Sequence, residues 1–203
     1  ADQGRQAFYQ GPISESLAAF SKRQGGWLSQ EDLARHRSTW EEPISTEYRG
    51  YTVWELPPNS QGLAALQMLN LLECFDLKSL GRTSPDFWHL LAEAKKLAFG
   101  DRAKYYADPA YSPIPVARLL SNSYAKERAG LIRLTGVRLQ DPPGDPEVLN
   151  QKETTMICTA DRHGMMVALI QSHYTGFGSG YTLPEWGFGL QNRGALFSLV
   201  PGH

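Results

Sequence analysis

Apolar residues recur with helical spacing through the first two thirds of the chain. In residues 11–26, Ile13, Leu17 and Phe20 share one face, which predicts an amphipathic helix that ends at a glycine pair. The same spacing or a helix-start signal predicts three more helices: a short one from a Ser29–Asp32 capping box, a long amphipathic one at 84–106, and one around 121–132.

The remaining patterns indicate one buried helix and two β-hairpins. Residues 63–75 are apolar nearly all round, which is typical of a helix buried in a core. Residues 43–58 form two β-rich runs around the turn Arg49–Gly50, and residues 152–171 alternate apolar and polar positions around a second turn.

A stretch of different composition divides the chain into two regions. Residues 135–153 contain three prolines, two glycines and few large apolar residues, which indicates a surface loop or linker. We therefore expect a helix-rich region at 1–134, this linker, and a β-rich region at 154–203. The predicted fold class is α+β.

Composition excludes several classes of partner. The chain has 203 residues, 41% of them hydrophobic, and a formal net charge of −1, so we expect neither nucleic acid nor an anionic membrane surface as partner. No apolar run has the length of a membrane span, and the first residues lack the apolar stretch of a signal peptide. The compartment, cytoplasm or periplasm, stays open. Cys74 and Cys158 sit in apolar settings and are predicted to be buried thiols.

Most motifs for metal, cofactor or serine chemistry are missing from the sequence. The five histidines show neither HxxxH nor HxH pairing and no nearby cysteine cluster, so no metal site is predicted. GFGSG, residues 176–180, lacks the GK[ST] ending of a phosphate-binding loop, and a tight turn or backbone held open near a ligand is expected instead. No GxSxG elbow is present, and no cofactor is predicted.

The threonine pair Thr154–Thr155 suggests a different chemistry. β-Branched residues favour strands, so the pair by itself indicates only a strand start. Its position directly after an exposed loop, however, suits self-cleavage of the bond between Glu153 and Thr154. The freed α-amino group of Thr154, with a reference pKa of about 7.7–8.0, could then act as general base for its own hydroxyl.

Several longer motifs resemble the γ-glutamyltransferase family. GGWLSQEDLARHRSTWEEPISTEYRGYTVWELPPNSQGLAALQMLNLLE, EAKKLAFGDRAKYYADP and LLSNSYAKERAGLI are similar to its large subunit, and TT, FGSG and GFGLQN to the start of its small subunit. The resemblance covers essentially the whole chain. It implies an N-terminal-nucleophile hydrolase, an αββα sandwich that matures by autocleavage before a threonine, which then carries the acyl group.

The matching positions give the predicted site. Thr154 corresponds to the nucleophile, and Ser172 to a hydroxyl residue that hydrogen-bonds it. Asn192 corresponds to one asparagine of the family's pair, and Gln191 replaces the other. The family's TTHxSVVD is TTMICTAD here, so Met156 stands in place of a histidine.

The predicted substrate-binding positions depart from the family. Its members hold the α-amino group of a glutamyl substrate with asparagine, a polar residue and aspartate, and the matching residues here are Tyr174, Arg193 and Leu196. A guanidinium repels an ammonium group but binds a carboxylate through bidentate hydrogen bonds. Glutathione is therefore not expected to be the preferred substrate. The stretch QNRGALFSLVPGH, residues 191–203, is more similar to a branch of the family that includes acylases and an oxamate amidohydrolase.

Family members are more than twice as long as this chain. We therefore expect a fragment, the end of a large subunit joined to the start of a small one, whose missing remainder supplies the oxyanion hole. The expected function of the parent is cleavage of a small-molecule amide, γ-glutamyl or related, with hydrolysis or transfer to an acceptor. The alternative is an uncleaved, inactive fragment or pseudoenzyme that only binds or packs.

Overall fold

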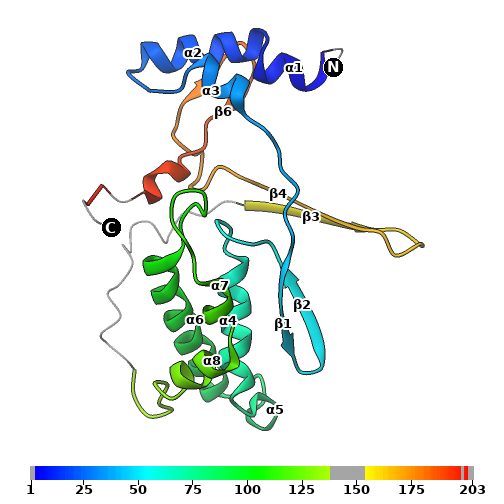
Figure 1. The fold of residues 1–203 in the computed structure, drawn as a ribbon, viewed down its shortest axis with the longest axis vertical. Helices are drawn as coiled ribbons and strands as arrows, with labels where there is room; N and C mark the ends of the chain where they lie inside the picture. The colour runs from blue at the N-terminus through cyan, green and yellow to red at the C-terminus, as the bar shows by residue number, and fades with distance from the viewer. Residues whose placement is uncertain (1–2, 138–153, 198, 201–203) are drawn as a thin grey trace. The chain divides into compact units, whose positions relative to one another are not determined.

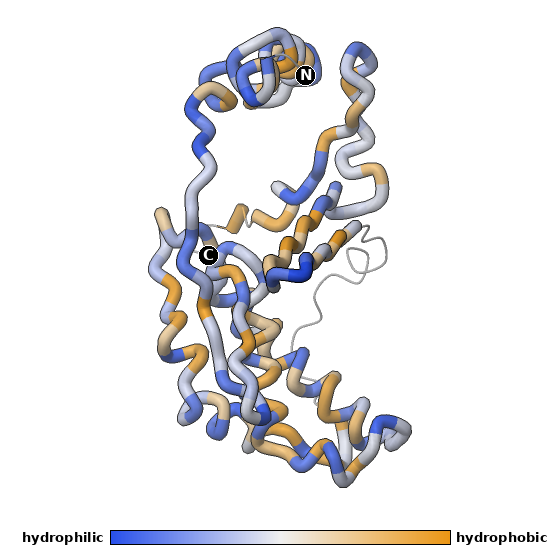
Figure 2. The backbone as a smooth tube through the Cα atoms, turned by 90° about the vertical axis from the view of Figure 1, so that its right-hand side faces the viewer, coloured by the Kyte–Doolittle hydropathy of each residue, from blue (hydrophilic) through white to orange (hydrophobic). Residues whose placement is uncertain are grey.

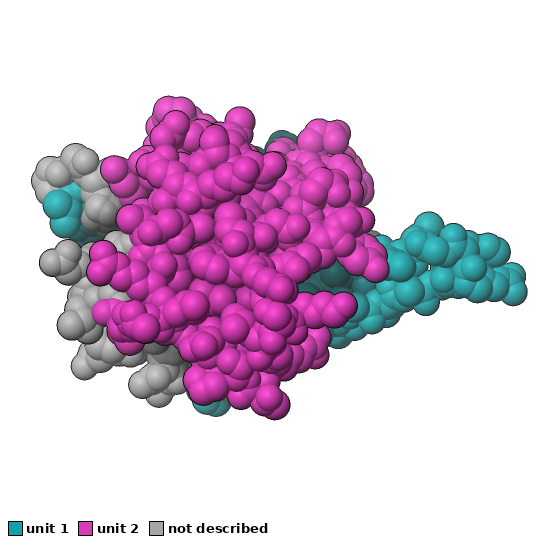
Figure 3. Space-filling model, turned by 90° about the horizontal axis from the view of Figure 1, so that it is seen from below, with its two compact units in different colours: residues 1–38, 143–203 teal, residues 39–142 magenta. Residues whose placement is uncertain are grey.

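The computed structural model describes residues 3–137, 154–197 and 199–200, which form two compact units. Unit 1 combines residues 1–38 with 143–203, and unit 2 contains residues 39–142 (Figure 3). The two units are defined by which residues pack together. The division predicted at the Glu153–Thr154 bond is defined by an expected cleavage site, and it stays a prediction. The linker predicted at 135–153 lies almost wholly outside the described residues, and Glu153 lies outside them too.

Unit 2 is a small antiparallel hairpin beside a helical layer (Figure 1). Its elements are β1 (Ile44–Tyr48), β2 (Tyr51–Glu55), α4 (Gly62–Glu73), α5 (Leu77–Leu80), α6 (Pro85–Tyr105), α7 (Val116–Leu119) and α8 (Asn122–Ala129). Their core consists of Leu71, Leu72, Leu90, Ala94, Leu97 and Ala129. The predicted buried helix at 63–75 and the long helix from Ser84 are confirmed as α4 and α6.

A buried polar group joins three parts of unit 2. Asp101 on α6 is 6% exposed and accepts hydrogen bonds from Gln67 Nε2 at 2.9 Å, Tyr124 Oη at 2.9 Å and Arg128 at 3.2 Å. Burial and this hydrogen bond to Asp101 raise the pKa of Tyr124 to about 12. Because these partners come from α4 and α8, the carboxylate holds the helical layer together at a buried point.

Unit 1 pairs the N-terminal helices with short strands from the end of the chain. Its elements are α1 (Gly4–Tyr9), α2 (Pro12–Arg23), α3 (Gln30–Arg35), β3 (Thr154–Ala160), β4 (Met166–Ser172), β5 (Thr182–Leu183), β6 (Phe188–Gly189) and the 3-10 helix η1 (Arg193–Leu196). Leu17 and Leu33 bury their side chains against Leu183, which closes a small core. The predicted capping box is present, with the Ser29 side chain accepting from the Asp32 N–H and the Asp32 carboxylate from the Ser29 N–H.

The hairpin β3–β4 is hydrophobic along most of its length (Figure 2). Alternation puts Met156 and Ile170 on one face and Ile157 and Leu169 on the other, and all four are more than half exposed. Strands that are apolar on both faces are typical of sheets covered on both sides, but no part of the described chain covers either face.

Three further observations bear on the sequence predictions. Cys74 and Cys158 are both exposed, so the prediction of buried thiols is wrong: Cys74 lies at the C-terminal end of α4, and Cys158 lies on the uncovered hairpin. The elements mix helix and strand, as predicted. None of the helices among the described residues has the length and apolar character needed to span a membrane.

Candidate active site

Thr154 and Ser172 meet at the open end of the β3–β4 hairpin. Thr154 is the first residue of β3 and Ser172 the last of β4, and the antiparallel register pairs them directly. Side chains of a directly opposed pair point to the same face of the sheet. The Thr154 hydroxyl accordingly donates a hydrogen bond of 3.0 Å to Ser172 Oγ.

A second donor converges on the same serine oxygen. The backbone N–H of Tyr174 donates to Ser172 Oγ at 2.9 Å. Ser172 therefore connects the hydroxyl of Thr154 to the segment that follows β4. This segment includes the predicted substrate-binding residue Tyr174.

Tyr174 and Arg193 form a stacked pair. Tyr174 is 6% exposed and has a left-handed backbone, with φ of 79°, which is uncommon for a residue other than glycine. The guanidinium carbon of Arg193 lies 5.1 Å from the centre of the Tyr174 ring, within the range of a cation–π contact. Arg193 is exposed, and its backbone N–H donates a hydrogen bond to Gln191 Oε1. A stacked guanidinium of this kind can still present its N–H edge to a carboxylate.

Asn192 is engaged within the chain. Its Nδ2 donates to Thr175 Oγ1 at 2.7 Å, and its Oδ1 accepts from the Thr175 N–H at 3.3 Å. A direct substrate contact by Asn192, as expected from the family, stays a prediction. Sequence reasoning missed Thr175; its only signal was a hydroxyl residue between Tyr174 and the GFGSG motif.

The GFGSG motif is a tight turn held against another part of the chain. The N–H of Ser179 donates to the carbonyl oxygen of Leu190 at 2.8 Å. Gly178 has φ of 59°, and a Cβ added to it would lie 2.2 Å from that same oxygen. A residue with a side chain does not fit there, which gives the glycine a structural role.

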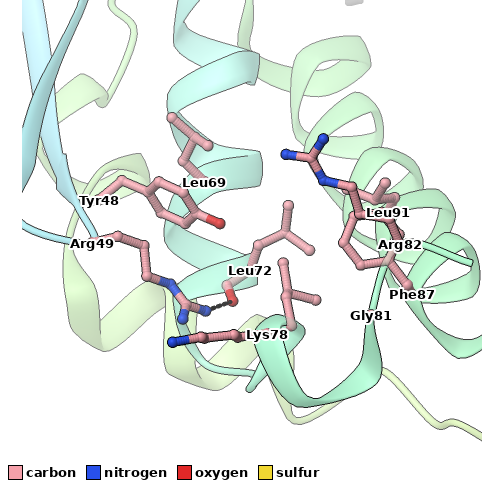
Figure 4. Close-up of a pocket in the computed structure, with 10 residues that line it drawn as sticks. Tyr48, Arg49, Leu69, Leu72, Lys78, Gly81, Arg82, Phe87 and Leu91 are labelled. Carbon is pink, nitrogen blue, oxygen red and sulfur yellow. Dashed lines mark hydrogen bonds between the residues drawn. The ribbon is translucent and has the colours of Figure 1, made fainter. Parts of the chain in front are cut away.

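No metal centre is found among the described residues. They contain no group of three or more histidine, cysteine, aspartate or glutamate side chains that could hold an ion. A cavity of about 520 Å³ lies in unit 2, between β1, α4, α5 and α6 (Figure 4). Its leucine-rich wall is flanked by Arg49, Lys78 and Arg82, and Arg49 also donates to the carbonyl of Phe75 and pairs with Glu73. None of the predicted site residues lines it.

Comparison with known proteins identifies the family. Residues 1–203 match the Gamma-glutamyltranspeptidase family. The chain is 37% identical over 203 residues to the glutathione hydrolase-like YwrD proenzyme of Bacillus subtilis (strain 168), covering 100% of this chain and 38% of that protein. It is 38% identical over 203 residues to the Acylase ACY 1 proenzyme of Pseudomonas sp. (strain SE83), covering 100% of this chain and 36% of that protein. It also resembles the crystal structure of cephalosporin acylase from Bacillus halodurans, with a TM-score of 0.84 and 44% identity over 98% of this chain and 35% of that one.

The chain therefore belongs to the gamma-glutamyltranspeptidase family, and the resemblance expected from its motifs is confirmed. It spans little more than a third of the length of these relatives, in agreement with the predicted fragment. The relatives that it matches are named as a glutathione hydrolase-like proenzyme and as acylases. The particular reaction, substrate and partners of the parent protein are matters for proposal.

Proposed function

We propose that the parent protein is a self-processing amidohydrolase or acyltransferase in which Thr154 is the nucleophile. The observation that carries this proposal is the 3.0 Å hydrogen bond between the Thr154 hydroxyl and Ser172 Oγ. It holds the hydroxyl in a defined orientation at the first residue of a strand. Membership of a family whose relatives are proenzymes supports the same assignment.

Self-processing would proceed by an acyl shift. The Thr154 hydroxyl oxygen attacks the Glu153 carbonyl carbon, the peptide C–N bond breaks, and the departing nitrogen takes the hydroxyl proton to become the free amine of Thr154. Water then hydrolyses the ester, which leaves Glu153 with a carboxylate and restores the hydroxyl. The new α-amino group stands beside Thr154 Oγ and can accept its proton in later turnovers.

Substrate cleavage would repeat the same chemistry on another amide. Thr154 Oγ attacks the substrate carbonyl, the amine leaves with one proton, and an ester to Thr154 remains. Water converts this ester to a carboxylic acid, or an acceptor amine converts it to a new amide. Missing parts of the large and small subunits would supply the donors that stabilise the tetrahedral intermediate, so the isolated chain is expected to be inactive.

The acyl group is expected to carry a carboxylate rather than an α-amino group. Arg193, stacked on Tyr174, offers a cation at the predicted acyl pocket, and Leu196 adds no negative charge to attract an ammonium. A dicarboxylic half-amide such as a glutaryl amide fits this arrangement better than a γ-glutamyl amide.

The uncovered hairpin supports the proposed sandwich. Both faces of β3–β4 expose large apolar side chains. In the full-length parent we expect one face to pack against a second sheet and the other against helices, giving the αββα arrangement. A full-length structure that leaves either face in contact with water would contradict this expectation.

Autocleavage tests the nucleophile directly. Full-length wild-type protein should separate into two chains on a denaturing gel, with threonine as the new N-terminus in sequencing. The variant Thr154→Ala should remain one chain. Thr155→Ala is the matched control, because Thr155 is the next residue but pairs with Gln171 on the opposite face of the hairpin. A wild-type chain that never separates, or a Thr154→Ala chain that still does, refutes the proposal.

The acyl preference is tested with two chromogenic amides. Glutaryl-p-nitroanilide and γ-glutamyl-p-nitroanilide differ only in the α-amino group, so their ratio of kcat/KM isolates its effect. We expect the glutaryl compound to be preferred and the variant Arg193→Leu to lose that preference. Strong preference of the wild type for the γ-glutamyl compound would contradict the role given to Arg193.

A further inference from the structure

Asn192 occupies a helix N-cap position without capping the helix. It immediately precedes η1, yet its side chain makes no hydrogen bond to the helix backbone. Asparagine at such a position ordinarily accepts from a backbone N–H of the first turn. Here both polar groups of the side chain are directed at Thr175, seventeen residues earlier.

We call the two hydrogen bonds that join Thr175 and Asn192 the Thr175–Asn192 clasp. Asn192 Nδ2 donates to Thr175 Oγ1 at 2.7 Å, and the Thr175 N–H donates to Asn192 Oδ1 at 3.3 Å. The backbone N–H of Asn192 also donates to the carbonyl oxygen of His173 at 3.2 Å. Both clasp residues are partly buried, so breaking the side-chain bonds leaves polar groups with reduced access to water.

The clasp lies next to both members of the stacked pair. Tyr174 immediately precedes Thr175, and Arg193 immediately follows Asn192. Tyr174 has a left-handed backbone that costs free energy for a residue with a side chain, so surrounding contacts must hold it in place. The clasp and the hydrogen bond from the Tyr174 N–H to Ser172 provide those contacts on either side of the residue.

We propose that Thr175 and Asn192 are positioning residues that set the place of Arg193 relative to Thr154. Through the clasp, the segment that carries the guanidinium is joined to the segment that continues from Ser172, which in turn orients the Thr154 hydroxyl. In this role Thr175 affects the substrate through the position of Arg193. This inference rests on the proposed function, because it requires Arg193 to bind the carboxylate of the acyl group.

The test compares two amides in the full-length protein. Glutaryl-p-nitroanilide has the carboxylate that Arg193 would bind, and valeryl-p-nitroanilide has an acyl chain of the same length without it. The isosteric variant Thr175→Val removes only the hydroxyl of the clasp. We expect the ratio of kcat/KM, glutaryl over valeryl, to fall about tenfold, as for loss of one well-formed hydrogen bond, chiefly through a higher KM for the glutaryl amide.

Three further variants separate positioning from general damage. Thr175→Ser keeps the hydroxyl and should restore the ratio. Asn192→Leu should lower it at least as far as Thr175→Val, and the double variant should be no worse than Asn192→Leu alone, because the two residues act as one unit. Thr83→Val is the surface control: its side chain has no hydrogen bond within the described parts of the chain. Autocleavage is measured for each variant, and rates are expressed per cleaved molecule.

The outcomes distinguish the two proposals. A wild-type protein that autocleaves and prefers the glutaryl amide, while Thr175→Val lowers both amides equally or neither, overturns the positioning role and leaves the proposed function intact. Failure of Thr175→Ser to restore the ratio also overturns it. A wild-type protein that hydrolyses neither amide refutes the proposed substrate class and the positioning role together.

Discussion

Replacement of Asp101 by asparagine should strongly destabilise the helical layer of unit 2. The substitution keeps the shape of the side chain but removes its charge. Asp101 accepts only, and all three partners are donors: Gln67, Tyr124 and Arg128. Asparagine would present an NH₂ group to at least one of them. If Gln67 turned over to offer its Oε1 to the new amide, its Nε2 would face Tyr106 Oη, and the tyrosine hydroxyl would lose the acceptor that it now has.

The expected loss of stability depends on the contacts that Arg128 keeps in the Asp101→Asn variant. Arg128 would keep a hydrogen bond of 3.2 Å to the carbonyl of Leu97 and its contact with the Tyr124 ring, but it would lose its carboxylate partner. Its Nε is already buried without a hydrogen-bond partner among the described residues. Removing one partner of a buried ion pair costs about 3–5 kcal/mol. Because the Arg128 side chain is 23% exposed, water compensates in part, and we expect about 3 kcal/mol.

Urea unfolding of the full-length protein, followed by circular dichroism, measures this loss. The midpoint should move to lower urea at an unchanged slope, since the exposed surface of the unfolded chain does not change. The control is Glu31→Gln, which breaks the exposed pair with Arg35 and should have little measurable effect. A loss below about 1 kcal/mol for Asp101→Asn would refute the claim that the buried carboxylate organises this layer.

Three other predictions address the turn, the serine and pH. Gly178→Ala should abolish amide hydrolysis in the full-length protein, because the added Cβ would lie 2.2 Å from the carbonyl oxygen of Leu190. Gly180→Ala is the control: Gly180 has φ of 75° but open space around it, so this variant should lose only about 1 kcal/mol of stability. If the two variants lowered the activity and the melting temperature equally, the prediction would be contradicted. Ser172→Ala should slow autocleavage at least tenfold on a timed gel, since an acceptor for the Thr154 hydroxyl is lost, and Ser172→Thr should retain it. The pKa of Tyr124 is raised to about 12 in the folded state, so its contribution to stability is complete below pH 10 and is lost as the pH rises towards 12. Urea midpoints measured from pH 9 to 11.5 should fall less steeply for Tyr124→Phe than for the wild type; identical slopes would show that Tyr124 is not responsible.

Local sequence patterns predicted α2, α3, α4, α6 and α8, whereas the short helices α1, α5 and α7 were not predicted. α2, α4 and α6 lie where the spacing of apolar residues placed them, and the capping box at Ser29 and the N-cap at Ser84 mark true helix starts. These features depend on residues three or four positions apart, so a short stretch of sequence contains all the information required. Burial of the two cysteines could not be judged in this way, because it depends on which distant segments cover them.

The sequence also predicted Thr154, Ser172, Tyr174 and Arg193 as site residues, through motifs and family resemblance. What it could not give is their contacts. The Thr154–Ser172 bond depends on the register of β3 against β4, and the stacking of Arg193 on Tyr174 depends on a turn that returns the chain to the end of β4. A register of β3 against β4 shifted by one residue would put the side chains of Thr154 and Ser172 on opposite faces of the hairpin.

From the sequence alone, most of the elements and the family could be predicted correctly, and Thr154 could be named as the expected nucleophile. Only the tertiary structure decided that residues 1–38 pack with the end of the chain, and that Asn192 binds Thr175 instead of capping η1. The physical reason is the same in both cases. Helix formation follows from local spacing, whereas hydrogen bonds between segments far apart in the chain form only after loop closure has brought their donors and acceptors together.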